Sequence, residues 1–311
     1  MDNIICIAGP TASGKTALAV ALAKQLNGEV ISCDSMQIYR RMDIGTAKPT
    51  VEEMQGIPHH MIDVADPDED FSVSRYCEMA TPILDDILAR GKIAIIAGGT
   101  GLYMDSLIKG NDFAPYPATG ARERLEAEAD EKGMEHVLEK LRSIDPEAAE
   151  KLHLADRKRI IRALEVFEET GQTITAHNKR TQTIPPRYEP LWLGLDFEPR
   201  QRLYDRIDLR VDIMLEQGLV KEIEDLLSSG ISAKCTALQA IGYKEFVAAL
   251  DGNGTIEEAA DEVRKASRHY AKRQLTWFRR NPKMNWLTRH EGEEFSEILC
   301  RARQLARQFD K

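Results

Sequence analysis

Residues 9–16 read Gly-Pro-Thr-Ala-Ser-Gly-Lys-Thr, and they follow directly on the apolar run Ile-Ile-Cys-Ile-Ala at residues 4–8. The stretch fits the phosphate-binding pattern G-x-x-x-x-G-K-[ST], and residues 17–26 continue as an amphipathic helix, as this loop requires. Its glycines let backbone N–H groups close around phosphate oxygens at a helix N-terminus, where the helix dipole favours an anion. We therefore predict a phosphate site in which Lys15 supplies a point charge and the Thr16 hydroxyl holds Mg²⁺.

The chain has 311 residues, which is enough for about two domains of ordinary size. A composition of 42% hydrophobic and 30% charged residues is typical of a globular protein, so extensive disorder is excluded. The five cysteines are scattered and odd in number, which predicts neither a disulfide framework nor a zinc site. The N-terminal apolar run is too short for a signal or a membrane span, so we expect a cytoplasmic protein with no membrane partner.

The formal net charge of −9 argues against nucleic-acid binding, which depends on Lys and Arg contacts with phosphates. The charges are nevertheless unevenly distributed, because residues 63–70 and 123–131 are acidic whereas residues 157–162 and 264–280 are basic. Aromatic residues lie among the basic ones in the last of these segments, as an RNA-contacting surface requires. Simple matching of charges to a helix dipole, on a solvated face, is the alternative interpretation.

Short apolar segments at residues 4–8, 29–33 and 92–97 alternate with helical stretches at 17–26 and 75–89. This alternation predicts a parallel α/β sheet. Ligands of such sheets bind beyond the carboxyl ends of the strands, so we expect the segments that follow the three strands to surround one cleft.

The pattern changes after a turn-rich stretch at residues 111–120. The helices expected next cover residues 121–132, 134–141, 146–152 and 157–169. A polar connector at 173–186 leads to a returning strand at 191–196. Further helices are expected at 200–216, 220–227, 235–250 and 255–280, the last opened by a capping box at Thr255 and Glu258. We therefore predict an α/β fold: a P-loop NTPase-like core with a parallel sheet at residues 1–112 and 190–311, and an inserted all-helical domain at residues 113–189.

Asp34 ends the second predicted strand, where a carboxylate would face the phosphate loop and could act as a general base. Two alternatives stay open: it could cap the next helix, or it could be an indirect Mg²⁺ ligand. The nearby Gln37 is suited to reading an adenine edge. Thr100, after Gly98 and Gly99, offers a hydroxyl at the mouth of the same cleft.

Two signatures of nucleotide hydrolysis are missing. The strand at 92–97 does not end in the acidic residue that an ATPase needs, and the Asn-Lys-x-Asp sequence of GTPases is absent. Arg206 and Arg210 lie one helical turn apart and could neutralise a diphosphate, although surface pairing with Asp205, Asp208 or Asp212 is an equal alternative. His59 and His60 lack a third metal ligand at a sensible spacing, and we interpret them as turn or supporting residues.

Seven runs of the chain together closely resemble the tRNA dimethylallyltransferases, also called isopentenyl-diphosphate:tRNA transferases. They are Gly9-Pro-Thr-Ala-Ser-Gly-Lys-Thr16, Asp34-Ser-Met-Gln-Ile-Tyr39, Met42-Asp-Ile-Gly-Thr-Ala-Lys-Pro49, Gly98-Gly-Thr-Gly-Leu-Tyr103, Arg159-Ile-Ile-Arg-Ala-Leu-Glu165, Ile241-Gly-Tyr-Lys-Glu245 and Ala271-Lys-Arg-Gln-Leu-Thr-Trp-Phe-Arg279. They occur in the family's order along the whole chain. The phosphate loop alone is common to many enzymes, whereas the series is highly specific.

The resemblance implies transfer of a dimethylallyl group from dimethylallyl diphosphate to the exocyclic amine of the adenine 3′-adjacent to a tRNA anticodon, with release of diphosphate. It also implies Mg²⁺ as the cofactor, and an inserted helical domain that grips the anticodon stem-loop. The zinc finger of eukaryotic members is absent, so the chain resembles the bacterial form. We expect it to be a monomer.

The resemblance also implies roles for individual residues. Asp34 resembles the family's general base and Thr100 its partner at the adenine, and Lys15 completes the catalytic set. The implied diphosphate site consists of Gly9, Thr11, Ala12, Ser13, Gly14, Lys15 and Thr16 with Arg206 and Arg210, either of which could be the family's diphosphate-binding arginine. The implied tRNA-contacting residues are Asp34, Ser35, Met36, Gln37, Thr100, Arg122, Lys158, Arg159, Ile160, Ile161, Arg162, Gly242, Tyr243, Lys244, Lys272, Arg273, Gln274, Trp277 and Arg279.

Three other functions compete with this one. A small-molecule kinase would use the same loop for ATP, but the chain has no adenine-binding or lid signature. A prenyltransferase acting on free adenine nucleotides would leave the inserted helices and basic segments without a role. An RNA-binding nucleotide switch is disfavoured by the missing hydrolysis signatures.

Overall fold

The fold is described here from a computed structural model, in which residues 2–111 and 119–309 are described. The chain divides into two compact units. One, the sheet unit, consists of Met1–Gly110 and Arg187–Lys311, and the other, the helical unit, is Asn111–Pro186.

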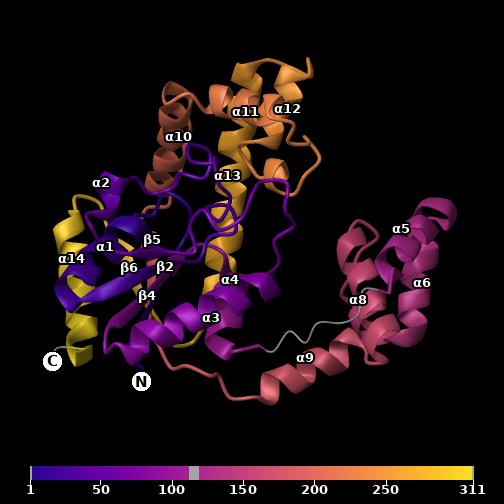
Figure 1. Ribbon diagram of the computed structural model, residues 1–311, viewed down its shortest axis with the longest axis horizontal. Coiled ribbons are helices and arrows are strands. Elements are labelled where there is room, and N and C mark those ends of the chain that lie inside the picture. Colours follow the sequence, from indigo (N-terminus) through magenta and orange to yellow (C-terminus); the bar gives the residue numbers. More distant parts are fainter. Residues whose placement is uncertain (1, 112–118, 310–311) are drawn as a thin grey trace. The chain divides into compact units, whose positions relative to one another are not determined.

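The sheet unit is built on six parallel strands in the order β3-β2-β4-β1-β5-β6 (Figure 1). Their bounds are β1 Ile4–Ala8, β2 Gly28–Ser32, β3 His59–His60, β4 Ile93–Gly98, β5 Leu191–Phe197 and β6 Met284–Arg289. The four strands expected from the apolar runs are all present, so the prediction of a parallel α/β sheet is confirmed. β1 lies between β4 and β5, and β4 lies between β1 and β2. The segments that follow β1, β2 and β4 therefore meet at one edge of the sheet.

Two strands were not predicted. We interpreted His59 and His60 as turn or supporting residues, whereas they form the edge strand β3 beside Val30 and Ile31. β6 has only one buried residue, Leu287, among partly exposed neighbours. Neither segment carries the buried apolar run or the strict alternation by which a strand is recognised in a sequence.

Helices surround the sheet. In the sheet unit they are α1 Lys15–Leu26, α2 Val51–Met54, α3 Val73–Ala89, α4 Gly101–Lys109, α10 Gln201–Glu216, α11 Leu219–Ser228, α12 Lys244–Leu250, α13 Ile256–Phe278 and α14 Phe295–Leu305, with short 3₁₀ turns at Ala237–Gln239 and Ala306–Phe309. Apolar residues of α1 and α14 pack against one face of the sheet, where Ile5, Leu18 and Ile95 are fully buried (Figure 1). A second core gathers α10 to α13 around Phe246 and Tyr243.

The single helix predicted at residues 235–250 is wrong. The chain forms a 3₁₀ turn at Ala237–Gln239, and α12 starts only at Lys244. Between them Gly242 has φ of 93°, a left-handed conformation that no helix interior allows. The following Tyr243 is fully buried, and its hydroxyl donates to Glu222 Oε1 at 2.7 Å. The capping box at Thr255 and Glu258 is confirmed at the start of α13.

The helical unit contains α5 Ala121–Lys132, α6 Met134–Ile144, α7 Pro146–Glu150, α8 Arg157–Thr170 and α9 Ile174–Thr183. They enclose a core that includes Leu125, Val137, Leu141 and Leu164. The polar connector predicted at 173–186 is instead mostly α9, whose first turn is capped by the Thr173 hydroxyl accepting from Ala176 N. Most of the turn-rich stretch predicted at 111–120 lies outside the described residues.

A buried carboxylate supports the amino-terminal end of β2. Glu29 is 3% exposed and accepts hydrogen bonds from Arg90 Nη2 at 2.9 Å and Lys92 Nζ at 2.6 Å, and it also pairs with His60 Nε2 at 2.9 Å. These hydrogen bonds, that of Arg90 foremost, hold the pKa of Glu29 well below its ordinary value. The carboxylate thus neutralises Arg90 and Lys92 and joins β2 to His60 of the edge strand β3.

Replacing Glu29 with glutamine is expected to lower the free energy of unfolding by about 2–4 kcal/mol near neutral pH, because Arg90 and Lys92 lose their anion. Since the folded pKa of Glu29 is lowered, the stabilisation is present above the unfolded pKa and is lost as the pH falls towards the folded one. Urea titrations at several pH values measure this difference. The exposed Glu291→Gln is the control, and equal stability of Glu29→Gln and wild type at neutral pH would contradict the prediction.

Candidate active site

The phosphate loop joins β1 to α1 and leaves the Ser13 hydroxyl and the first amides of α1 without partners among the described residues. The Ser13 hydroxyl is buried and has no hydrogen-bond partner among the described residues. Lys15 Nζ turns back onto the loop and donates to Pro10 O at 2.7 Å. Gly14 caps α1 with φ of 91° and provides no capping side chain, so the first amides of α1 stay open. A buried unpaired hydroxyl beside open amides and an ammonium fits a bound anion.

Burial of the Lys15 ammonium lowers its pKa from 10.5 to about 8, an effect that the negative charge of Asp34 opposes and the positive charge of Arg210 reinforces. The three groups are therefore close enough for their charges to interact. Two cations held together in a partly buried site are stabilised by a multiply charged anion. The charges at this edge of the sheet therefore suit a multiply charged anion.

The two arginines of α10 have different roles in the structure. Arg206 Nε donates to Ala12 O at 2.9 Å, and its guanidinium lies 5.5 Å from the centre of the Phe197 ring, so Arg206 braces the phosphate loop. Arg210 has no hydrogen bond or ion pair with any described residue. Burial lowers the pKa of Arg210, and Asp34 acts in the opposite direction. Arg210 is the guanidinium that is left free for a ligand.

The alternative that these arginines pair with the carboxylates of their own helix is wrong. Arg268 donates to Asp208 Oδ2 at 2.7 Å, and Arg264 pairs with Asp212. Asp205 accepts instead from Gln201 Nε2 at 2.8 Å. Because α13 and a neighbour on α10 satisfy these carboxylates, Arg210 keeps its charge for the cleft.

Asp34 follows β2 and stands in a turn. Its Oδ1 accepts from Met36 N at 2.9 Å, and no hydrogen bond from a described residue reaches Oδ2. No helix begins here, since the next one is α2 at Val51, so the helix-capping alternative is wrong. One carboxylate oxygen holds the turn and the other stays available for a proton.

Thr100 is held beside Asp34 by the ends of two adjacent strands. Its Oγ1 accepts from Ser35 N at 3.0 Å, and its backbone N–H donates to Cys33 O at 3.2 Å. This close approach requires Gly98, because a Cβ there would lie 1.9 Å from Cys33 O. The expected cleft therefore has the phosphate loop, Asp34 and Thr100 at one edge of the sheet.

Gln37, which was predicted to read an adenine edge, has its side-chain amide engaged within the protein. Its Oε1 accepts from Ser32 Oγ at 3.0 Å, while its Nε2 donates to Thr46 O at 3.3 Å and Ala47 O at 3.1 Å. Both ends of the amide are used within the protein, so Gln37 holds the turn at residues 46–47 and offers no free edge to an adenine in this structure.

The basic segment of α13 divides into two parts. Arg264 and Arg268 are paired with α10, so they join two helices and form no free surface. Lys272 and Arg273 are exposed, and the Arg273 guanidinium lies 5.5 Å from the Tyr270 ring centre. The two interpretations of the segment, a solvated face that matches the helix dipole and an RNA-contacting surface, treated all of its basic residues alike. In the structure, only the later residues, such as Lys272 and Arg273, are exposed and available to RNA.

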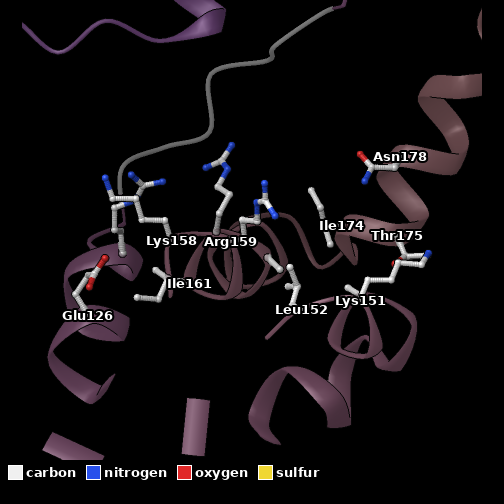
Figure 2. Close-up of a pocket in the computed structure, with 13 residues that line it drawn as sticks. Glu126, Lys151, Leu152, Lys158, Arg159, Ile161, Ile174, Thr175 and Asn178 are labelled. Carbon is white, nitrogen blue, oxygen red and sulfur yellow. The ribbon is translucent and has the colours of Figure 1, made fainter. Parts of the chain in front are cut away.

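Basic residues also gather around a pocket of about 720 Å³ in the helical unit. Figure 2 shows Lys158 and Arg159 of α8 at its rim, with Leu152, Ile161 and Ile174 supplying apolar surface. Arg122 and Arg162 complete the rim and share Glu165, each at 2.8 Å. The pocket combines cationic groups with an apolar floor.

Several predicted tRNA contacts are buried side chains. Ile160 and Tyr243 are 0% exposed, Ile161 is 1% exposed and Gln274 is 5% exposed. These side chains are not free to make surface contacts with RNA in this structure. They support neighbouring residues that are exposed. Arg279 is exposed and donates to Asp196 Oδ2 at 2.9 Å. The exposed Arg122, Lys158, Arg159, Arg162, Lys244, Lys272 and Arg273 remain predicted contacts.

The sequence placed Tyr270 among the aromatic residues of the basic segment, and it did not reveal that Tyr270 lies beside Thr100. Burial raises the pKa of its hydroxyl to about 12, and hydrogen bonding with Thr100 and Gln274 partly offsets the rise. Tyr270, Gln274 and Trp277 recur at i, i+4 and i+7 on α13, so one face of this helix meets the cleft. This helical spacing was the feature of the sequence that could have indicated that Tyr270 belongs to the site.

No cluster of three or more His, Cys, Asp or Glu side chains suited to a metal occurs in residues 2–111 and 119–309. Across the same part of the chain, no helix has the length and apolar character needed to cross a membrane.

Family models match most of the chain. The model described as IPP transferase matches residues 37–281, and the one described as isopentenyl transferase matches residues 2–67. Among curated proteins, the tRNA dimethylallyltransferase of Acetivibrio thermocellus is 48% identical over 300 residues, with 96% of each chain covered. That of Bacillus cytotoxicus is 46% identical over 299 residues, with 96% of this chain and 94% of its own covered.

Solved structures agree. The tRNA isopentenylpyrophosphate transferase of Bacillus halodurans matches with a TM-score of 0.74 and 44% identity, covering 100% of this chain and 97% of its own. A eukaryotic dimethylallyltransferase acting on tRNA matches with a TM-score of 0.84 and 30% identity, covering 97% of this chain and 78% of its own. With likeness of this extent along the whole sequence, the chain belongs to the tRNA dimethylallyltransferase family and is a transferase enzyme.

Proposed function

We propose that the protein transfers a dimethylallyl group from dimethylallyl diphosphate to the exocyclic amine of the adenine 3′-adjacent to the anticodon of tRNA, releasing diphosphate. One observation carries the proposal. A phosphate loop with an unpaired Ser13 hydroxyl, Lys15 and the free guanidinium of Arg210 lies at the same sheet edge as Asp34 and Thr100. A leaving-group site thus adjoins a base site.

The leaving group is stabilised on one side of the cleft. As the allylic C–O bond breaks, its electron pair goes to the diphosphate, whose added charge is met by the loop amides, Lys15 and Arg210. Donors aimed at the developing charge stabilise the transition state more than the ground state. The missing hydrolysis signatures agree with a loop that holds diphosphate and does not hydrolyse a nucleotide.

Mg²⁺ fits this site as a cofactor bound together with the diphosphate. The Thr16 hydroxyl, at the start of α1, would hold it, and the described residues offer no acidic cluster that could bind it independently. When bound, the ion would supply additional positive charge for the leaving diphosphate. The unpaired Ser13 hydroxyl gives the loop a further polar group, which supports this part of the proposal.

Asp34 and Thr100 would act on the nucleophile, at the other side of the cleft. The adenine amine forms the new C–N bond and loses a proton, which the free Oδ2 of Asp34 accepts. The Thr100 hydroxyl, oriented by Ser35, would hold the amine in line with the allylic carbon. The adenine must leave its stack to reach this point, at a cost of a few kcal/mol.

The exposed basic residues supply the contacts that offset this cost. Lys272 and Arg273 are exposed on α13, and the rim of the helical unit's pocket carries Lys158, Arg159 and Arg122. We propose that they bind the phosphates of the anticodon stem-loop. We further propose that the protein acts as a monomer in the cytoplasm.

A product assay tests the proposed function. The purified protein is incubated with dimethylallyl diphosphate, Mg²⁺ and unmodified tRNA, and the digested nucleosides are examined by mass for adenosine carrying one C₅H₈ group. Parallel reactions contain AMP in place of tRNA, or ATP with small acceptors. Modified tRNA supports the proposal, whereas ATP consumption with a small acceptor and no modified tRNA supports a kinase.

Arg210→Gln is expected to raise the KM for dimethylallyl diphosphate about 10- to 100-fold, because a charge-assisted contact with the diphosphate is lost. Arg206→Gln is the matched variant one turn away, and we expect a smaller effect because its guanidinium braces Ala12 O. Steady-state kinetics at saturating tRNA measure both. A larger effect of Arg206→Gln would reverse this assignment.

A further inference from the structure

A buried amide ties the phosphate loop to the turn that carries Thr100. Gln274, on α13, is 5% exposed. Its Oε1 accepts from Thr11 N at 2.9 Å, and its Nε2 donates to Gly99 O at 3.0 Å. One side chain therefore uses both of its ends to join two loops that follow different strands, β1 and β4.

The contact is sterically specific. A Cβ on Gly99 would lie 2.1 Å from Gln274 Nε2, so glycine at this position leaves the space that the amide fills. A Cβ on Gly101 would similarly lie 2.3 Å from Trp277 Cδ1, and Trp277 Nε1 donates to Asp105 Oδ2 at 2.9 Å. The inner face of α13 thus packs closely on the β4–α4 turn.

The amide of Thr11 is not available to a phosphate while Gln274 accepts from it. Both ends of the Gln274 amide are engaged by backbone groups, so Gln274 contributes to the site through the positions of the two loops that it joins. The same helix exposes Lys272 and Arg273 on its outer side, within two residues of Gln274. Helix α13 therefore carries both the exposed cations and the side chain that joins the two loops of the cleft.

We propose that Gln274 is a positioning residue for the transfer. It sets the separation between the phosphate loop, where the diphosphate departs, and Thr100, where the amine attacks. Misplacement by about 1 Å costs on the order of a hundredfold in rate, so a lost bridge is expected to lower kcat. The inference rests on the proposed function.

Gln274→Met keeps the side chain's length and removes both hydrogen bonds. Gln274→Glu keeps the acceptor for Thr11 N and places an oxygen against Gly99 O. For each variant we expect kcat per tRNA-binding site to fall about 10- to 100-fold, while the KM for dimethylallyl diphosphate and the Kd for tRNA stay within about threefold. The exposed Gln304→Met on α14 is the control for the same chemical change and is expected to match wild type.

Normalising kcat to tRNA-binding stoichiometry separates positioning from misfolding, because unfolded protein lowers the stoichiometry and leaves kcat per site unchanged. Gly99→Ala provides a second test, since its added Cβ displaces the same amide. Combined with Gln274→Met, it is expected to add little to the single effect.

The outcomes are distinct. Wild-type kcat per site in either folded Gln274 variant overturns the inference, and so does a raised KM with unchanged kcat, which would make Gln274 a binding group. A fall in kcat with non-additive Gly99→Ala supports it. If wild type itself forms no prenylated adenosine, the proposed function fails first and the inference falls with it.

Discussion

Asp34→Asn is expected to lower the rate of prenyl transfer about 10²- to 10⁴-fold while leaving tRNA affinity nearly unchanged, because an amide cannot accept the proton of the attacking amine. Asparagine is the appropriate replacement because its side-chain oxygen can still accept from Met36 N, as Oδ1 of Asp34 does at 2.9 Å. The turn after β2 should therefore persist, and the change should affect only the free oxygen.

Single-turnover transfer with saturating enzyme measures the chemical step, and filter binding measures tRNA affinity. Asp34→Ala serves as a comparison, because it also removes the turn's acceptor and should add a loss of stability. Transfer at the wild-type rate by Asp34→Asn would remove Asp34 as the base. Weakened tRNA binding with an unchanged chemical step would instead make Asp34 a contact residue.

Lys15→Met is expected to lower kcat about 10²- to 10³-fold, because a preorganised cation at the developing charge is lost. The same variant is expected to be more stable near neutral pH by about 2 kcal/mol, since burial lowers the pKa of Lys15 to about 8 in the folded protein. Opposite effects on activity and stability are typical of a charge that is held for function.

The pH dependence of that stability gain has a defined sign. Below pH 8, Lys15 is charged in both folded and unfolded chains, so the folded protein bears the full cost of the buried charge. From about 8 to 10.5, the folded protein releases the proton while the unfolded chain retains it, and wild type gains stability. Urea unfolding across this range should show the variant's advantage shrinking. An advantage that grows with pH, or unchanged activity, would contradict the prediction.

The strongly patterned parts of the fold were predictable. The short apolar runs 4–8 and 92–97 alternate with helical stretches, which indicated buried strands, and the residues after them meet at one edge because parallel strands share a direction. The break in the helix at Gly242 and the edge strand β3 were not predictable, because the local hydrophobic pattern marks neither of them. Each depends on a partner that is distant in the sequence. Tyr243 reaches Glu222, and His60 reaches Glu29.

The same division holds within the candidate site. Lys15, Asp34 and Thr100 were found from loop pattern and strand ends, because these positions are set by local sequence. The different roles of Arg206 and Arg210 could not be predicted from the sequence, because two arginines one helical turn apart are equivalent until their partners are known. Arg264 and Arg268 of α13 satisfy the carboxylates of α10, and that contact leaves Arg210 free.

By itself, the sequence determined the phosphate loop, the parallel core and the family, since these depend on short motifs and on hydrophobic periodicity within single elements. Tertiary structure determined which side chains are free to act. Gln37 and Gln274 have the same amide group as any reader of a base, yet folding uses both ends of each amide inside the protein. Whether a polar group binds a ligand or supports the fold depends on which donors and acceptors lie within hydrogen-bond distance, and distant segments supply those partners.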